Sequence, residues 1–368
     1  MIHLLFFPLL AILAIASPLE SRAPKYNVTA MNIALNRGSG ILGSYSKCSG
    51  SLCSWMSKIS DDTKLIDISI PGTHDTASWN YTPLKQIEYL KYTNLIYPSS
   101  IYKCNKESIF KQLQSGNRAF DLRIGLSPKN SNDLIFFHSE AILDLNSKFE
   151  DILFGFWRFL DENPTETLII SIKDENSTFG SYNILQQNIY NTLTTNQAKI
   201  YINPTESISS INLSSVRGKM VILRRFNSPN NIGIDLTNNF KDNNEDFQII
   251  NSSPDGDDNI FIEDLYEPFT NFGLKSHVNK KLNVTISHIL NSSNKKNGEG
   301  LYITYASSEV ISQLLIPEIM SNGLIIPGVN LGLKNWLING KGKGLKQKGI
   351  IFTDFASDTT GLVEAIIA

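Results

Sequence analysis

The chain has 368 residues, of which 41% are hydrophobic and 10% aromatic, and this composition is typical of a folded globular protein rather than of a disordered chain. Its 33 Lys and Arg against 35 Asp and Glu leave a formal net charge of -2, so no general positive field exists to hold nucleic acid. The three cysteines show no CxxC or Cys/His ligand spacing, which argues against a disulfide scaffold and against zinc or iron–sulfur chemistry.

The first 16 residues form a short apolar run that ends in Ala14-Ile15-Ala16. An apolar run followed by a small-x-small sequence is typical of a secretory signal peptide, so we expect cleavage near Ala16 and a secreted protein. A signal peptide usually begins with a positively charged segment, but no Lys or Arg precedes this run, only His3. An uncleaved anchor is therefore the alternative. No second apolar run is long enough to span a membrane.

Residues 17–60 are rich in Ser and Gly and only weakly periodic, which predicts a pro-segment or an N-terminal arm on the main body. In an oxidising compartment the three thiols would allow one disulfide, and the sequence leaves the pairing open. The shortest loop joins Cys48 and Cys53, with Cys104 left over. A secreted chain with Asn-x-Ser/Thr sites is expected to be glycosylated. An Asn-rich chain contains many such sites by chance, so the sites themselves are weak support for secretion. They lie at Asn27, Asn80, Asn176, Asn212, Asn251, Asn283 and Asn291.

From residue 65 onward, short apolar runs alternate with segments of helical periodicity. The clearest helix is Phe149–Asn163, where apolar residues recur at i, i+3, i+4 and i+7. Gly116 and Gly323 stand where glycines end helices, after Ile109–Leu113 and Val310–Met320. Alternating strands and helices predict βα units and a mostly parallel sheet.

Eight apolar runs are strand candidates, and no internal repeat relates them. We therefore expect residues 61–368 to form one α/β domain, a distorted TIM-like (β/α) barrel. Polar residues follow several runs, and the carboxyl ends of parallel strands form the ligand-binding mouth of such folds. The runs are Leu65–Ile70, Ala119–Ile124, Leu134–Phe137, Thr167–Ile172, Met220–Leu223, Ile260–Ile262, Leu301–Tyr305 and Ile350–Thr353; the polar residues that follow include His138, Lys173, Arg224, Arg225, Asp264 and Asp354.

Two histidines at strand ends suggest acid–base chemistry. His74 follows the turn after the first run, and His138 follows the third. In the second run, alternation places Asp121 and Arg123 on one face, as either a structural ion pair or an anion site. Two imidazoles and a cation suit metal-free cleavage of a phosphodiester by an internal hydroxyl, because one ring takes a proton, the other gives one and the cation stabilises phosphoryl charge. A histidine after a turn is also a common solvated loop residue.

The segments that carry these residues resemble the X domain of phosphatidylinositol-specific phospholipase C, in its small secreted bacterial form. The resemblance rests on IPGTHD at 70–75, GNRAFDLR at 116–123, the strand that ends at His138, NPTETLIISIK at 163–173 and RGKMVILRR at 217–225. It runs in order from about residue 65 to residue 354. It implies a distorted (β/α) barrel that cleaves phosphatidylinositol to diacylglycerol and a cyclic inositol phosphate, with the inositol 2-hydroxyl as nucleophile.

The resemblance also implies roles for individual residues. His74 would be the general base and His138 the general acid, with Asp354 orienting His74 and Asp75 supporting His138. Arg123 would bind the phosphate. Calcium-dependent relatives place an acidic metal ligand where Arg123 stands, so the arginine implies an enzyme without a metal or other cofactor.

Inositol recognition is expected from Lys173 and Arg225, which lie in clear motif matches, and from Asp264 and Tyr266. The last two are aligned only by spacing, after an Asn/Asp-rich stretch at Asp242–Asn259 that resembles an inserted loop. Asp264 would accept hydrogen bonds from ring hydroxyls, and Tyr266 would stack on the sugar face. Lys173 also has a simpler interpretation as a solvated strand end.

The expected partner is phosphatidylinositol or a related inositol lipid at a membrane surface, bound interfacially by a monomer. Candidates for the lipid-facing rim are Trp79, Pro83–Tyr97 and Val310–Ile316, although apolar helix faces are more often part of the core. The Lys-rich segment Lys341–Lys348 is better explained as a solvated loop. Glycosylphosphatidylinositol anchors are a further substrate within the same class.

Two other functions stay open. One is a Mg²⁺-dependent barrel phosphodiesterase for other lipids, of the sphingomyelinase D or glycerophosphodiesterase kind, which the arginine at position 123 disfavours. The other is a catalytically silent lipid-binding module, which would retain the barrel without a complete catalytic set. All four of His74, Arg123, His138 and Asp354 are present.

Overall fold

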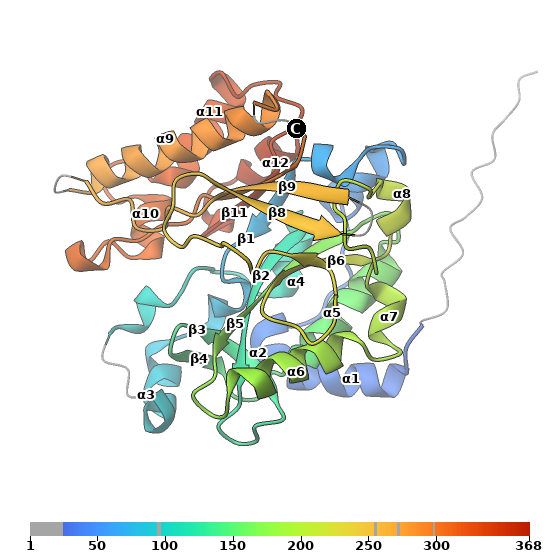
Figure 1. Cartoon of the computed structure of the whole chain (residues 1–368). Coiled ribbons are helices and arrows are strands. Elements are labelled where there is room, and N and C mark those ends of the chain that lie inside the picture. Colours follow the sequence, from blue (N-terminus) through green and yellow to red (C-terminus); the bar gives the residue numbers. More distant parts are fainter. Residues whose placement is uncertain (1–24, 94–96, 254–255, 271–272, 297–298) are drawn as a thin grey trace, which may run out of the picture.

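The computed structural model describes residues 25–93, 97–253, 256–270, 273–296 and 299–368. Its centre is one mixed β-sheet that curls into a nearly closed barrel (Figure 1). The signal peptide expected at residues 1–16 lies outside the described residues. In the described part of the chain, no helix is both long and apolar enough to cross a membrane.

The barrel wall consists of nine strands in the order β7-β6-β5-β2-β1-β11-β10-β9-β8. Neighbours are parallel except for β8, which pairs antiparallel with β9. A hairpin of β3 and β4 extends from the outer part of β2. The strands are β1 Ile70–Thr73, β2 Ala119–Leu126, β3 Leu134–His138, β4 Ala141–Asp144, β5 Leu168–Asn176, β6 Met220–Arg225, β7 Ile234–Asp235, β8 Phe247–Ser253, β9 Gly256–Glu263, β10 Leu301–Tyr305 and β11 Ile350–Thr353.

The barrel is open between β7 and β8, which do not pair as strands. A side chain bridges the gap instead, because the backbone N–H of Asp235 donates to Oδ1 of Asn251 over 3.2 Å. The predicted distorted TIM-like barrel is therefore confirmed, and its distortion lies at this seam.

Helices cover the outside of the barrel. In the view of Figure 1, α9, α11 and α12 lie along its upper flank and α1, α5 and α6 along its lower flank. The helices are α1 Val28–Arg37, α2 Ser39–Leu42, α3 Pro83–Thr93, α4 Ile109–Gln114, α5 Phe149–Glu162, α6 Tyr182–Leu193, α7 Ala198–Tyr201, α8 Leu213–Val216, α9 Leu274–Ser293, α10 Pro317–Asn322, α11 Val329–Asn339 and α12 Leu362–Ile367.

The two faces of the strands belong to different cores. On β2, Phe120 and Leu122 point outward and pack in one cluster with Phe156 of α5, whereas Ala119 belongs to the cluster inside the barrel. The interior also contains Ile70 from β1 and residues of β5, β6, β9, β10 and β11. Because side chains alternate along a strand, the inward row of each strand can be followed from this apolar core to the mouth.

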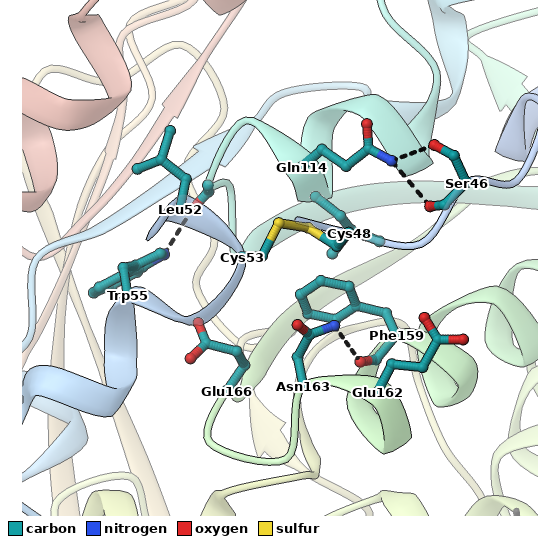
Figure 2. Close-up of a disulfide and its surroundings, with 12 residues drawn as sticks. Ser46, Cys48, Leu52, Cys53, Trp55, Gln114, Phe159, Glu162, Asn163 and Glu166 are labelled. Atoms are coloured by element: carbon teal, nitrogen blue, oxygen red, sulfur yellow. Dashed lines mark hydrogen bonds between the residues drawn. A yellow bond between two sulfur atoms is a disulfide. The ribbon is translucent and has the colours of Figure 1, made fainter. Parts of the chain in front are cut away.

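The N-terminal arm is packed against the body. A disulfide joins Cys48 to Cys53, and Figure 2 shows it beside the C-terminal end of α5. The buried guanidinium of Arg118 donates to the Cys53 carbonyl over 3.0 Å, and Trp55 donates to the carbonyl of Gly116 over 3.0 Å. These bonds tie the arm to the amino end of β2; the boundary at residue 60 stays a prediction.

The first predicted strand was misplaced. Leu65–Asp67 forms a 3₁₀ turn, and β1 begins only at Ile70 and continues through Pro71 and Gly72. The apolar run looked like a strand because Leu65 is buried beneath the barrel. Gly72 is required in β1, since a Cβ there would lie 2.7 Å from that of Ala119.

Three further predictions differ from the structure. The third run does form a strand, but β3 is antiparallel to β2 and lies off the barrel. The supposed loop Asp242–Asn259 contains all of β8 and the start of β9. The expected helix Val310–Met320 is broken, because Val310 bridges Leu315 and α10 begins at Pro317. By contrast, β10, β11 and α5 follow the predicted bounds closely.

Candidate active site

The site is built on the inward rows of the barrel strands. Two or four residues beyond an apolar core position, the inward row becomes polar: Asp121 and Arg123 follow Ala119 on β2, and Asp354 follows Phe352 at the end of β11. The same alternation places His74 after β1, Lys173 on β5, Arg225 on β6 and Asp264 after β9. Parallel strands end at one rim, so these side chains converge there.

His74 is held between a carboxylate and a guanidinium. Its Nδ1 lies 2.8 Å from Oδ1 of the buried Asp354, and its Nε2 lies 2.6 Å from Nη2 of Arg123. A guanidinium can only donate, so Nε2 must accept and the ring proton must sit on Nδ1, facing the carboxylate. The ring is therefore the neutral tautomer that can take a proton at Nε2.

The environment of His138 favours the protonated form of its ring. It comes from the β3–β4 hairpin, and its Nδ1 lies 2.7 Å from Oδ2 of Asp75 and 3.0 Å from the Tyr102 carbonyl. Burial lowers the pKa of the His138 imidazole, but the Asp75 carboxylate outweighs burial and raises this pKa to about 9. The ring is accordingly an imidazolium at neutral pH, with its centroid 6.4 Å from that of His74.

Arg123 is fixed on both sides by buried carboxylates. Its Nε lies 3.2 Å from Oδ2 of Asp121, and Nη1 lies 3.4 Å from Oε1 of Glu175. Burial raises the pKa of Asp121, but Arg123 and Arg225 lower it to about 2. Burial also raises the pKa of Glu175, but Arg123 and Lys173 lower it far below its usual range. The guanidinium is thus held rigidly beside His74.

The four predicted sugar-binding residues lie in the same pocket. Lys173 pairs with Oε2 of Glu175 at 2.7 Å, and Nη1 of Arg225 donates to the Tyr305 hydroxyl over 3.3 Å. Asp264 is buried, whereas Tyr266 is half exposed at the rim. Both follow β9, so the structure brings to the mouth the two residues that had been aligned only by spacing.

One cavity of about 340 Å³ joins these groups. Its wall contains His74, Arg123, His138 and Asp354 together with Lys173, Arg225, Asp264 and Tyr266. Asp75 lies behind His138 and, of the nine predicted residues, is the one outside the wall. The structure therefore assembles the whole predicted set, while the role of each residue stays a prediction.

Several residues of this site were not predicted. Glu175 joins Arg123, Lys173 and the backbone N–H of Ser139, and its position two residues after Lys173 on β5 could have revealed it. Tyr305 was named only as the end of a strand. Cys104 lines the cavity from a loop that carries no sequence motif, so no pattern could have placed it.

Comparisons with known proteins agree with this geometry. Residues 83–226 match the family described as phosphatidylinositol-specific phospholipase C, X domain. This segment of the chain is similar to that family. The matched residues include Arg123, His138, Lys173 and Arg225, while His74 and Asp354 lie outside them and are brought to the site by the barrel.

Two bacterial relatives show how far the similarity extends. The chain is 30% identical over 178 residues to a 1-phosphatidylinositol phosphodiesterase of Listeria monocytogenes, an alignment that spans 46% of this chain and 47% of the relative. It is 23% identical over 269 residues to the 1-phosphatidylinositol phosphodiesterase of Staphylococcus aureus strain Newman, with 69% and 74% covered. The sequence match to the Listeria relative therefore spans about half of its length.

The fold similarity is more extensive. A crystal structure of the phosphatidylinositol-specific phospholipase C of S. aureus superposes with a TM-score of 0.67 at 22% identity, covering 88% of this chain and 98% of that one. The enzyme from L. monocytogenes gives a TM-score of 0.60 at 22% identity, with 86% and 97% covered. The barrel fold of these two structures is thus shared by most of the chain, beyond the segment of the family match.

Proposed function

We propose that this protein is a phosphatidylinositol-specific phospholipase C that works as a metal-free phosphorus–oxygen lyase. The observation that carries the proposal is the pair of histidines in one cavity, with His74 between Asp354 and Arg123 and His138 against Asp75. A neutral and a protonated imidazole are the base and acid that an internal transfer at phosphorus needs. Similarity to the two bacterial phosphodiesterases supports the choice of substrate.

In the proposed reaction, Nε2 of His74 takes the proton of the inositol 2-hydroxyl, and the oxygen attacks phosphorus. The bond from phosphorus to the glycerol oxygen breaks, and His138 gives that oxygen its proton, releasing diacylglycerol. Arg123, which donates to Nε2 of His74, turns its donors to the phosphoryl oxygens as negative charge develops. The second product is the cyclic inositol phosphate, and no step uses a metal or a cofactor.

Inositol would occupy the half of the cavity formed by Lys173, Arg225, Asp264 and Tyr266. Cationic donors and one buried carboxylate suit a ring of hydroxyls, because each hydroxyl donates one hydrogen bond and can accept two. Burial raises the pKa of Asp264 while Arg225 opposes this. Glycosylphosphatidylinositol anchors contain the same inositol phosphate, and release of an anchored protein from membranes tests whether they are substrates.

The lipid-facing rim of this proposal is α3 and the loop between α10 and α11. On α3, Leu84 and Ile87 are 79% and 65% exposed, and Leu324 and Ile325 of the loop are exposed as well. Trp79 is a poorer candidate than expected, because its ring N–H is bonded to the arm at Ile41. Exposed apolar residues on these two segments suit interfacial binding without insertion of a helix.

We also propose that the protein is secreted and that cleavage occurs near Ala16. The Cys48–Cys53 disulfide supports this, since disulfides persist mainly in oxidising compartments. Amino-terminal sequencing of protein recovered from culture medium tests both points.

The deciding experiment incubates purified protein and EDTA with vesicles of phosphatidylinositol, phosphatidylcholine or sphingomyelin and identifies the phosphorylated product. We expect a cyclic inositol phosphate from phosphatidylinositol alone, and loss of the reaction in His74→Ala and His138→Ala. Complete loss of activity in EDTA would refute the metal-free mechanism. Wild-type rates in both variants would refute the site, and no product from any lipid would favour a silent binding module.

A further inference from the structure

Cys104 occupies an unusual position between the two histidine–carboxylate pairs. It is fully buried, it lines the catalytic cavity, and its Sγ lies 3.9 Å from Nδ1 of His138. The other two cysteines of the chain, Cys48 and Cys53, form the disulfide, so Cys104 is its single free thiol. The mechanism proposed above gives this thiol no task.

Metal-binding donors surround the thiol on two sides. Cys104 forms one group with His74 and Asp354 and another with Asp75 and His138, and within each group the donor atoms lie within 4.8 Å of one another. Tetrahedral zinc, with bonds of about 2.0–2.3 Å, needs donor atoms roughly 3.3–3.8 Å apart. Either group therefore reaches this geometry through small side-chain adjustments.

Both carboxylates have capacity left for a cation. Asp75 and Asp354 are each 1% exposed, and Oδ1 of Asp75 and Oδ2 of Asp354 are buried without a hydrogen-bond partner among the described residues. A buried oxygen without a partner is costly, and coordination to a cation would satisfy it. Asp354 itself lines the cavity that contains the thiol.

We propose that Cys104 anchors a binding site for a thiophilic divalent cation, Zn²⁺ or Cd²⁺, and that occupation of this site inhibits the enzyme. A thiolate with imidazole and carboxylate ligands selects such ions over Mg²⁺ and Ca²⁺, which prefer oxygen. The thiol loses its proton to solvent on binding. The sequence shows no ligand spacing for this site, because the fold brings together Asp75, Cys104 and His138 from distant parts of the chain.

Inhibition follows because the ion competes for catalytic groups, and this consequence rests on the proposed function. A cation on Cys104 takes donor electrons from one histidine–carboxylate pair, so that ring can no longer act as base or acid. A chelator would then increase the activity of a zinc-contaminated preparation, the reverse of its effect on a metal-dependent phosphodiesterase.

The test measures binding and activity separately, in buffer without reductant so that the disulfide stays closed. Cd²⁺ is titrated into the full chain while the ultraviolet absorbance of the cadmium–thiolate bond is recorded, and Zn²⁺ inhibition is measured on phosphatidylinositol, with Mg²⁺ and Ca²⁺ as control ions. Cys104→Ser is the test variant. Cys48→Ser/Cys53→Ser is the matched control, because it removes the other two sulfurs and leaves the cavity intact.

We expect a cadmium–thiolate band in the wild type and the double variant and none in Cys104→Ser. We also expect the inhibitory zinc concentration to rise about tenfold or more in Cys104→Ser, relative to its own metal-free rate. Absence of the band in the wild type, or equal zinc sensitivity in Cys104→Ser, overturns the proposal. A band without activity on any inositol lipid would uphold the site and overturn the proposed function. A cooperative thermal unfolding transition in each variant confirms its fold, with a lower midpoint expected for the double variant because it lacks the disulfide.

Discussion

The charge of Asp75 should set the alkaline limit of activity. The carboxylate lies 2.7 Å from Nδ1 of His138 and raises the pKa of that ring to about 9 against the effect of burial. In Asp75→Asn the charge is lost while the shape is kept, and burial and Arg123 then lower the pKa. We expect it to fall to its ordinary value near 6.5 or below.

The magnitude follows from the two pKa values. The general acid is protonated below its pKa, so the rate of the wild type falls as pH rises through about 9. A decrease from about 9 to about 6.5 corresponds to roughly 3 kcal/mol of interaction with the carboxylate. At pH 7 the protonated fraction of His138 should drop from nearly complete to about one quarter.

The assay is the pH dependence of kcat/KM on phosphatidylinositol micelles, because this ratio reports the ionisation of the free enzyme. Asn is well suited to position 75, whose φ is 41°, since Asn tolerates left-handed backbone better than most residues. Glu309→Gln is the matched control: it removes a carboxylate that raises the pKa of His138 less than Asp75 does. An alkaline limb that stays near pH 9 in Asp75→Asn would refute the assignment of His138 as the acid.

Three further predictions concern Arg123 at the phosphate site, the buried pair Lys281–Glu263 and the exposed residue Ile87 of the rim. Arg123→Lys replaces the planar fork that contacts His74 and Asp121, so kcat/KM should fall about 100-fold or more; steady-state kinetics check this, and a wild-type kcat/KM would contradict it. Lys281→Met removes the cation that pairs with buried Glu263 at 2.6 Å, so thermal unfolding should show a loss of about 3–5 kcal/mol that Glu263→Gln in the same chain recovers; no recovery would mean that the pair itself is not the cause. Ile87→Ser, at a position that is 65% exposed, should weaken vesicle sedimentation about tenfold and leave hydrolysis of a monomeric short-chain lipid unchanged, whereas equal loss in both assays would exclude a role at the interface.

The sequence predicted the parts of the fold that have strong local patterns. β10 and β11 are compact apolar runs and α5 is strongly amphipathic, so their limits were found almost to the residue. β7 has two residues and carries no pattern. β8 was missed because it lies in an Asn/Asp-rich stretch, where Phe247 and Ile249 are the apolar residues that β8 contributes to the barrel interior. Its strand structure depends on pairing with β9, which is not a local property.

The site divides in the same way. Residues on the inward row of a barrel strand, such as Arg123 and Lys173, could be predicted because alternation and the strand end together fix their position. The partners that set their charge were harder to find. Glu175 lies on the same row and was overlooked. Cys104 and Tyr102 reach His138 from a loop, so their contact exists only in the folded chain.

The charges of the site are compatible with the proposed binding of a phosphodiester by a chain with a net charge of -2. Arg123 and Lys173 share Glu175, and Nη1 of Arg225 lies 3.8 Å from Oδ1 of Asp121. Each of these three cations is therefore compensated by a buried carboxylate, so the fold does not contain an uncompensated buried charge. An incoming phosphodiester need not displace these carboxylates, because it can take the place of the neutral His74 ring as the acceptor for Nη2 of Arg123. Substrate binding would thus exchange one neutral acceptor for an anionic one, which strengthens the hydrogen bond and frees Nε2 of His74 to act as base in the same step.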